Sequence, residues 1–378
     1  MPTTAVYGGI MSGTSLDGLD GVIVDLGQQP PQILAQAHQR WPSDLVRRLM
    51  QAADGREVTT AEVLQMSQEV SESHVQLGQA LLCEVKRSSV AAVGMHGQTV
   101  WHHPPKGGVL GYSLQLGSAS WVAARLGIRV VSDFRLADMA LGGQGAPLAP
   151  YAHLRLFSHP SEIRAVLNLG GIANLTGLLP GQPVWASDVG PANMLMDDLA
   201  RHYSHGAFDY DPEGMHAARG KNHPELLTHL LADDFFALPF PKSTGRERFG
   251  GAFTRMLHTL TWDDASHTAG RLTVEGIARA IRSLPARPVR LIVAGGGVHN
   301  AWLMDQLAQA LFPVAVESSA AYGVDPLHLE AIAFALLAQA RLNGQCANLP
   351  SVTGARASTV LGVVADGRVT SGSEATPG

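Results

Sequence analysis

Three glycine-rich turns, each following a short apolar run, have the residue types that bind phosphate. The first spans residues 12–20 (SGTSLDGLD), the second spans residues 169–176 (LGGIANLT), and the third is Gly295-Gly296-Gly297. Backbone N–H groups in such turns can surround a phosphate, and small side chains let it approach closely. Three such turns in this order predict a duplicated nucleotide-binding fold, and phosphoryl transfer is therefore the first functional hypothesis.

The first turn combines phosphate-binding residues with two carboxylates. Gly13, Thr14 and Ser15 offer backbone amides and hydroxyl donors, whereas Asp17 and Asp20 follow closely. Carboxylates this close to a polyanion are compatible with it if one of them orients Mg²⁺-bound water or a substrate hydroxyl. The alternative is that the stretch only forms a hairpin turn. No Gly-Lys-Ser/Thr follows the glycines, so the turn is not a Walker loop.

Asp188 is the strongest candidate for a general base. It ends a predicted strand, and Gly190-Pro191 opens the helix that follows. A carboxylate at the carboxyl end of a strand projects to the edge where α/β sheets bind ligands, and it can accept a proton from an attacking nucleophile. The alternative is that Asp188 caps the helix.

Other polar residues are candidates for contact with a substrate. His96 and Gln98 follow a strand, and no acidic or thiol ligand at suitable spacing supports a metal site there. Arg135 lies just past another strand end and is suited to an anionic group. Glu330 opens an apolar helix, where a lone carboxylate is a favourable charge at the helix start.

The composition limits the class of protein that must position these residues. Of 378 residues, 46% are hydrophobic and 16% are charged, which is typical of globular domains, and the length suits two of them. The net charge of −5 without a basic block argues against binding nucleic acid or an anionic membrane. Two cysteines support neither a disulfide framework nor a zinc site, and we expect a cytoplasmic protein without a leader or membrane span.

The hydrophobic pattern alternates between strands and helices and restarts near the middle of the chain, which predicts α/β domains. Predicted strands span residues 5–11, 21–26, 90–95, 114–117, 130–133, 165–169, 172–177, 184–187, 289–294 and 360–364. Predicted helices span residues 45–53, 60–85, 118–126, 192–203, 274–284, 301–311 and 328–343. We expect a first domain of residues 1–135, rejoined by 350–369, a second domain of residues 136–349, and a flexible tail of residues 370–378.

Ten short motifs, in order along nearly the whole chain, resemble those of one kinase family. They are MSGTSLDGLD at 11–20, GMHGQT at 94–99, SDFR at 132–135, GGQGAPL at 142–148, NLGGIANL at 168–175, DVGPAN at 188–193, PKSTGRE at 241–247, GGG at 295–297, EAIAFA at 330–335 and LPSVTGA at 349–355. The chain is similar in these motifs to the anhydro-N-acetylmuramic acid kinases. That family belongs to the superfamily of sugar kinases, actin and heat-shock chaperones.

The resemblance implies two ribonuclease-H-like domains flanking a nucleotide cleft, and a specific reaction. The family opens 1,6-anhydro-N-acetylmuramic acid with water and phosphorylates O6 with ATP, giving N-acetylmuramic acid 6-phosphate in peptidoglycan recycling and amino-sugar catabolism. It also implies Mg²⁺, held largely through water near Asp17 or Asp188, and a homodimer.

The resemblance also assigns roles to single residues. Asp188 matches the base that activates the attacking water, and Glu330 matches a second catalytic acid. His96, Gln98, Arg135 and Asn193 are expected at the sugar, with Arg135 as the partner of its lactyl carboxylate. The expected ATP-binding residues are Gly13, Thr14, Ser15, Leu16, Asp17, Gly18, Leu19, Asp20, Gly170, Gly171, Asn174, Gly295, Gly296 and Gly297.

The chain departs from the family at two positions of the base motif. The family usually reads Asp-Thr-Gly-Pro-Gly-Asn, whereas this chain has Val189 and Ala192 in place of the Thr and the second Gly. A hydroxyl is lost at the first position, and backbone freedom is lost at the second. Two other functions remain open: a kinase for another amino sugar without ring opening, and a non-catalytic nucleotide-gated binding protein of the same fold.

Overall fold

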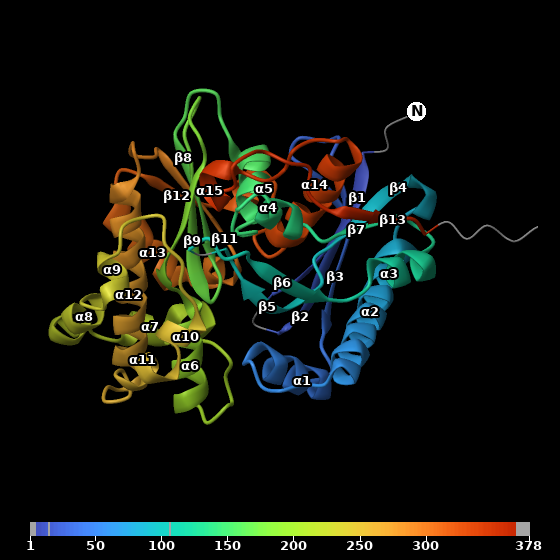
Figure 1. The fold of residues 1–378 in the computed structure, drawn as a ribbon. Helices are drawn as coiled ribbons and strands as arrows, with labels where there is room; N and C mark the ends of the chain where they lie inside the picture. Colours follow the sequence, from blue (N-terminus) through green and yellow to red (C-terminus); the bar gives the residue numbers. More distant parts are fainter. Residues whose placement is uncertain (1–4, 14–15, 106, 368–378) are drawn as a thin grey trace, which may run out of the picture. The chain divides into compact units, whose positions relative to one another are not determined.

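The structure, a computed structural model, describes residues 5–13, 16–105 and 107–367 and divides into two compact units (Figure 1). The first unit consists of residues 1–152 and 330–378, and the second consists of residues 153–329. The chain passes from one unit to the other within α5 (Ala149–Phe157) and returns at the start of α14 (Leu329–Leu342). The predicted tail, residues 370–378, lies outside the described residues.

The first unit is built on a six-stranded sheet in the order β13-β7-β4-β1-β2-β3. β2 pairs antiparallel with both β1 and β3, whereas β1, β4 and β7 are parallel. Its strands are β1 (Val6–Ser12), β2 (Gly18–Asp25), β3 (Gln32–Arg40), β4 (Val90–Met95), β7 (Val130–Ser132) and β13 (Val363–Ala365). A separate antiparallel hairpin is formed by β5 (Gln98–His103) and β6 (Tyr112–Leu116).

The second unit repeats this strand order in a five-stranded sheet, β10-β9-β8-β11-β12. Here β9 is antiparallel to β8 and β10, and β8, β11 and β12 are parallel. The strands are β8 (Arg164–Leu169), β9 (Ile172–Leu178), β10 (Trp185–Pro191), β11 (Arg290–Ala294) and β12 (Ala315–Ser318). When the strands of each sheet are counted in chain order, both sheets contain the same sequence of neighbours: third, second, first, fourth, fifth. The predicted duplicated α/β fold is therefore confirmed.

Helices complete each unit, and several begin at the caps that the sequence provides. Thr59 and Glu62 form a reciprocal capping box at the start of α2 (Thr60–Cys83), and Ser118 accepts a hydrogen bond from the Trp121 N–H at the start of α3 (Ala119–Leu126). The other helices of the first unit are α1 (Ser43–Ala53), η1 (Arg87–Ser89), α4 (Leu136–Ala140) and α15 (Pro350–Thr353). Those of the second unit are α6 (Asn193–Tyr203), η2 (Pro212–Gly214), α7 (Met215–Arg219), α8 (Pro224–Leu231), α9 (Asp234–Ala237), α10 (Arg246–Phe249), α11 (Gly251–Arg255), α12 (Trp262–Ser283), η3 (Gly296–His299), α13 (Ala301–Leu311) and η4 (Ser319–Tyr322).

The observed units place residues 136–152 and 330–349 with the first unit, whereas the sequence suggested the second. The reason is the close packing of α14 on the first sheet. A Cβ at Gly9 would lie 1.9 Å from the Ala331 carbonyl oxygen, and one at Gly94 would lie 2.1 Å from that of Phe334. Only glycine lets the helix backbone approach β1 and β4 this closely.

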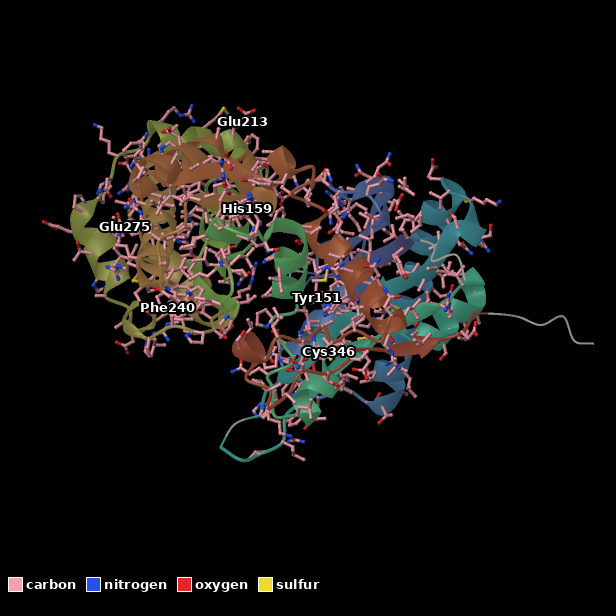
Figure 2. The ribbon with its side chains drawn as sticks, turned by 90° about the horizontal axis from the view of Figure 1, so that it is seen from above. Tyr151, His159, Glu213, Phe240, Glu275 and Cys346 are labelled. Carbon is pink, nitrogen blue, oxygen red and sulfur yellow. The ribbon has the colours of Figure 1, made fainter. Side chains whose placement is uncertain are left out.

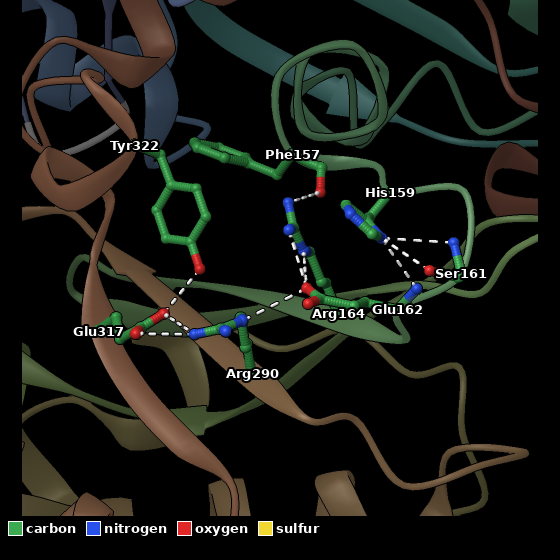
Figure 3. A network of polar contacts seen from close by, with 8 residues as sticks. All are labelled: Phe157, His159, Ser161, Glu162, Arg164, Arg290, Glu317 and Tyr322. Carbon is green, nitrogen blue, oxygen red and sulfur yellow. Dashed lines mark hydrogen bonds and ion pairs between the residues drawn. The ribbon is translucent and has the colours of Figure 1, made fainter.

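Ion pairs link the three parallel strands of the second unit through Arg164 and Arg290, the first residues of β8 and β11, and through Glu317 of β12 (Figure 3). Arg164 of β8 and Arg290 of β11 are register partners, and both bond the Glu162 carboxylate. Arg290 also pairs with Glu317 of β12 at 2.9 Å, and the Tyr322 hydroxyl donates to the same carboxylate. The network fixes the end of the sheet opposite the glycine turns, so it supports the register without entering the candidate site.

Among the described residues, no helix has both the length and the apolar character needed to cross a membrane.

Candidate functional site

In the first unit, the turn after β1 is held by side chains from a distant part of the chain. The Ser12 hydroxyl donates to Gln98 Oε1, and Gln98 Nε2 donates to the carbonyl oxygens of Gly13 and Thr99 at 3.3 and 3.1 Å. Gln98 has no exposed surface. The predicted substrate residue Gln98 therefore supports the start of the predicted phosphate loop.

His96 links this turn to Arg135. His96 Nδ1 donates to the Ser12 carbonyl at 3.1 Å, and Arg135 donates to Nε2 at 2.8 Å, so the ring is neutral and carries its proton on Nδ1. Burial, together with the charge of Arg135, lowers the pKa of His96 to about 3. A second Arg135 N–H donates to the Gly145 carbonyl at 2.8 Å. The predicted pair His96 and Arg135 is thus brought together beside the turn.

Arg135 is a cation without a carboxylate partner among the described residues. Burial lowers the pKa of its guanidinium to about 10, and no acidic group offsets that effect. Its Nε is also buried without a hydrogen-bond partner. A buried cation is costly unless it is paired, so this arrangement is suited to an incoming anion.

The other residues predicted in the first turn divide between the core and the surface. Leu16 and Leu19 are core residues, at 7% and 0% exposure, and Gly18 starts β2 where a Cβ would lie 2.4 Å from the Gln39 carbonyl oxygen. Asp17 is exposed, and Asp20 bonds His38 at 2.8 Å. The predicted residues Thr14 and Ser15 lie outside the described residues.

In the second unit, both oxygens of the Asp188 carboxylate accept hydrogen bonds. Asn174 Nδ2, from the neighbouring strand β9, donates to Oδ1, and the Thr244 backbone N–H donates to Oδ2 at 2.9 Å. Burial raises the pKa of Asp188 above its usual value, whereas these two donors oppose the rise and the charge of Glu247 adds to it. The carboxyl is thereby oriented and shifted toward accepting a proton, as a general base requires.

Asn174 was predicted to bind ATP, and in the structure its side chain donates to Asp188. Two further residues beside Asp188 were not chosen as site residues from the sequence: Thr244, whose Oγ1 is buried without a partner among the described residues, and Lys242. The signal was present in the motif at 241–247. Residues 241–245 of this motif lie in no helix or strand, and the motif gave no indication of which strand it accompanies.

The second glycine turn is held by the backbone at the start of α6. The Gly170 carbonyl accepts from the Asn193 N–H at 3.0 Å, and the Gly171 carbonyl accepts from the N–H groups of Ala192 and Met194 at 2.9 and 3.3 Å. A Cβ at either glycine would meet no atom closer than 3.7 Å. The protein's own packing does not demand glycine there, and an open surface of backbone is what a phosphate would use.

The third glycine cluster lies beside this turn and borders a hollow of about 410 Å³. A Cβ at Gly295, whose φ is +82°, would lie 2.5 Å from Asn168 Oδ1, so only glycine fits. Gly296 and Gly297 line the hollow with Asn193, Tyr210 and Glu213, all from the second unit (Figure 2 labels Glu213). The Asn193 side chain, which also lines the hollow, donates to the Leu169 carbonyl of the second glycine turn at 2.9 Å.

The two departures from the base motif both lie in the core. Val189 is 1% exposed and Ala192 is fully buried, and both belong to the apolar cluster of the second unit. The Val189 side chain therefore packs in the core of the second unit. Ala192 keeps its N–H bond to Gly171 and has a negative φ of −121°.

Glu330 lies in the first turn of α14, in the first unit. Among the described residues, no three His, Cys, Asp or Glu side chains gather where they would hold a metal ion. A Mg²⁺ ion held mainly by phosphate oxygens and water needs only one or two carboxylates. The exposed Asp17 fits that limited role.

Comparison with known proteins gives a consistent result. The family model described as anhydro-N-acetylmuramic acid kinase matches residues 5–367. A curated anhydro-N-acetylmuramic acid kinase from Xylella fastidiosa strain Temecula1 is 40% identical over 368 residues, covering 95% of this chain and 96% of that protein.

Among solved structures, the chain is similar to a ROK family glucokinase from Streptomyces griseus in complex with glucose and AMPPNP. The TM-score is 0.40 and the identity 14%, over 88% of this chain and 98% of the other. It is also similar to the activator of 2-hydroxyisocaproyl-CoA dehydratase from Clostridium difficile with bound ADPNP, with a TM-score of 0.44 and 13% identity, over 88% and 93% of the two chains. On the family match over nearly the whole chain and the 40% identity to the Xylella protein, the chain belongs to the anhydro-N-acetylmuramic acid kinase family.

Proposed function

We propose that this ATP-dependent sugar kinase opens 1,6-anhydro-N-acetylmuramic acid with water and phosphorylates the freed O6. The observation that carries the proposal is the Asp188 carboxylate, oriented at both oxygens and with a raised pKa, in a chain of this family. The product is N-acetylmuramic acid 6-phosphate, which is an intermediate of peptidoglycan recycling.

The proposed step balances as follows. Asp188 accepts a proton from water, whose oxygen bonds the anomeric carbon, and the bond from that carbon to O6 breaks. O6 then takes the γ-phosphoryl group of ATP, leaving ADP. Asn174 and the Thr244 N–H keep the carboxylate oriented toward the water, and such positioning lowers the barrier. Glu330 is proposed as a second acidic group of the reaction.

The nucleotide is assigned by its chemistry to the glycine segments. The first turn and the open backbone at Gly170 and Gly171 suit phosphates, and the hollow beside Gly296 and Gly297 suits the nucleoside. Mg²⁺, when bound, would neutralise phosphate charge, with Asp17 as the residue that holds it, largely through water. A homodimer in the cytoplasm completes the proposal.

Arg135 is proposed to bind the lactyl carboxylate of the sugar. Its support is the buried guanidinium with an unpartnered Nε and no carboxylate partner among the described residues. A carboxylate accepting from such a group forms a charge-assisted hydrogen bond. His96, bonded to the same guanidinium, would keep it in place.

The test is ADP release from Mg·ATP with four sugars, with the products analysed by mass spectrometry. The sugars are 1,6-anhydro-N-acetylmuramic acid, 1,6-anhydro-N-acetylglucosamine, N-acetylmuramic acid and N-acetylglucosamine. We expect a product heavier than the first sugar by one water and one phosphoryl group, and much weaker turnover of the second, which lacks the lactyl carboxylate. ADP release only with the two open sugars would exclude coupled ring opening, and equal turnover of both anhydro-sugars would exclude the role of Arg135.

A further inference from the structure

Lys242 is a buried cation that the reaction above does not use. It is 9% exposed, and its Nζ donates to the carbonyl oxygens of Phe235 and Leu238 at 2.8 and 3.4 Å. Nζ also lies 4.3 and 4.2 Å from the ring centroids of Phe235 and Phe240 (Phe240 is labelled in Figure 2). Two ring faces and two carbonyl groups therefore hold the ammonium group.

No carboxylate among the described residues balances this charge. Burial lowers the pKa of Lys242, and the other group that acts on it is a second cation, Arg279. A buried ammonium without an ion pair is costly, and an aliphatic side chain would fill the same space without that cost. The lysine must therefore have a role that an apolar residue cannot fill. Its contacts indicate that this role is to fix the position of the backbone.

The backbone of Lys242 is joined to the strand that carries the base. The Asp188 N–H donates to the Lys242 carbonyl at 3.0 Å, and the Lys242 N–H donates to Ser187 Oγ at 2.9 Å. Ser187 Oγ in turn contacts the Lys242 carbonyl at 3.1 Å. Residue 242 thus lies along β10 at the position of Asp188.

Two residues later, the same segment reaches the carboxylate itself. The Thr244 N–H donates to Asp188 Oδ2 at 2.9 Å. Because this donor belongs to the backbone, only the path of the chain decides where it points. On the N-terminal side of Thr244, Lys242 fixes that path, because the intervening Ser243 is exposed.

We propose that Lys242 is a positioning residue for Asp188, acting through the backbone N–H of Thr244. The ammonium group, held by Phe235, Leu238 and the Phe240 ring, anchors residues 241–244, and the anchored segment presents the Thr244 N–H to Asp188. The inference rests on the proposed function, because it assumes that Asp188 is the base of the reaction.

The charged groups around Asp188 give the expected direction of a change in its pKa. The Thr244 N–H and Asn174 lower that pKa, whereas burial and Glu247 raise it. If the segment loses its anchor, the Thr244 donor is weakened and the pKa of Asp188 rises further. Since the base must be unprotonated, the acid limb of the kcat/KM profile would move to higher pH.

The test compares Lys242→Met with the wild type and with Lys221→Met, which makes the same change at an exposed position of the same unit. We expect Lys242→Met to lower kcat by about tenfold and to move the acid limb up by about one pH unit. The KM for ATP should change less than about twofold, and Lys221→Met should behave as the wild type. Circular dichroism and calorimetric ATP binding establish that the variant is folded.

A second variant covers the case in which Lys242→Met does not fold. Phe240→Leu removes one ring face and leaves the lysine, and it should move the acid limb in the same direction by a smaller amount. An unchanged pH profile in the folded variants would overturn the inference, as would an effect confined to the KM for ATP, which would mean that Lys242 binds phosphate directly. If the wild type does not turn over the anhydro-sugar at all, the proposed function fails first, and the two failures are therefore distinguishable.

Discussion

The turns that follow the first strand of each sheet are held in different ways. In the first unit, the turn after β1 depends on side chains, namely those of Ser12, Gln98 and His96. In the second unit, the carbonyls of Gly170 and Gly171 accept from backbone N–H groups at the start of α6. A backbone contact survives a change of side chain, whereas a side-chain contact does not. The second turn should therefore tolerate substitutions that the first does not.

Ala192 illustrates this difference. It replaces a glycine that the family usually has, yet its N–H still donates to the Gly171 carbonyl at 2.9 Å. The departure leaves the turn intact because the contact does not depend on the residue type. In the first unit, no comparable replacement for Gln98 would keep both its acceptor and its donor, except an amide of the same length.

The largest effect is expected where the second unit does depend on a side chain, at Asp188, the proposed base. Asp188→Asn should lower kcat by about a thousandfold, because general base catalysis contributes roughly 10² to 10⁴ in rate, while ATP still binds. Turnover of the anhydro-sugar and calorimetric titration with ATP measure the two quantities.

Asp305→Asn makes the same change at an exposed position of α13 and serves as the control. Near-normal turnover of Asp188→Asn would disprove the base assignment. Loss of ATP binding together with turnover would instead mean that Asp188 supports the nucleotide site.

A matched pair of amide truncations measures the difference between the two turns directly. Gln98→Ala leaves the Ser12 hydroxyl and the Gly13 carbonyl without their buried partner, which should lower the free energy of unfolding by about 3 kcal/mol and raise the KM for ATP about tenfold. Asn193→Ala removes a single side-chain bond, to the Leu169 carbonyl. It should cost about 1 kcal/mol and raise the same KM less than about threefold.

Urea unfolding and initial rates at varied ATP concentration give both values for each variant. Equal effects of the two truncations on the KM for ATP would break the comparison, because the backbone contacts of the second turn would then not be sufficient to hold it.

Much of the fold follows from local patterns in the sequence. The strand Val90–Met95 and the helix Ala301–Leu311 have the predicted bounds, because a short buried run and an amphipathic stripe each specify one kind of element. The strand β3 was missed, because glutamines, a histidine and an arginine make up more than half of its residues and Ile33 is its one β-branched residue. The helix α12 begins at Trp262, well before the predicted start, because its first turns are rich in polar residues and its cap, Thr261, was not recognised.

The candidate site was predictable in its residue types but not in its pairings. The sequence indicated His96, Arg135 and Asp188 as candidate site residues, because the first two follow predicted strands and Asp188 ends one. It could not indicate that Asn174 bonds Asp188 or that Thr244 does, since these contacts depend on strand register and on a loop path. The division of the chain was also missed in part, because the approach of α14 to Gly9 and Gly94 is a tertiary contact with no local signal.

A further prediction concerns the charge state of His96. Its pKa is about 3 in the folded protein, against 6.5 for an ordinary histidine. Below pH 6.5 the unfolded chain takes up a proton that the folded chain does not, so the free energy of unfolding falls as the pH falls toward 3. For one such residue the slope is about 1.4 kcal/mol per pH unit. His96→Asn removes this titration. Between pH 6 and pH 4, the free energy of unfolding of the variant should therefore change with pH less steeply than that of the wild type, by about 1.4 kcal/mol per pH unit.

The measurement is urea unfolding of wild type and variant at pH 7, 6, 5 and 4, with His103→Asn, an exposed histidine of the same unit, as the control. At pH 7 the variant should be less stable than the wild type, because the acceptor for Arg135 is lost. Since its slope is shallower, the two curves should approach each other as the pH falls. Parallel curves for wild type and variant would mean that His96 takes up a proton in the folded state as well. The turn after β1 would then keep its shape when the Arg135 contact to Nε2 breaks, and the dependence of this turn on side chains would reduce to Gln98 and Ser12.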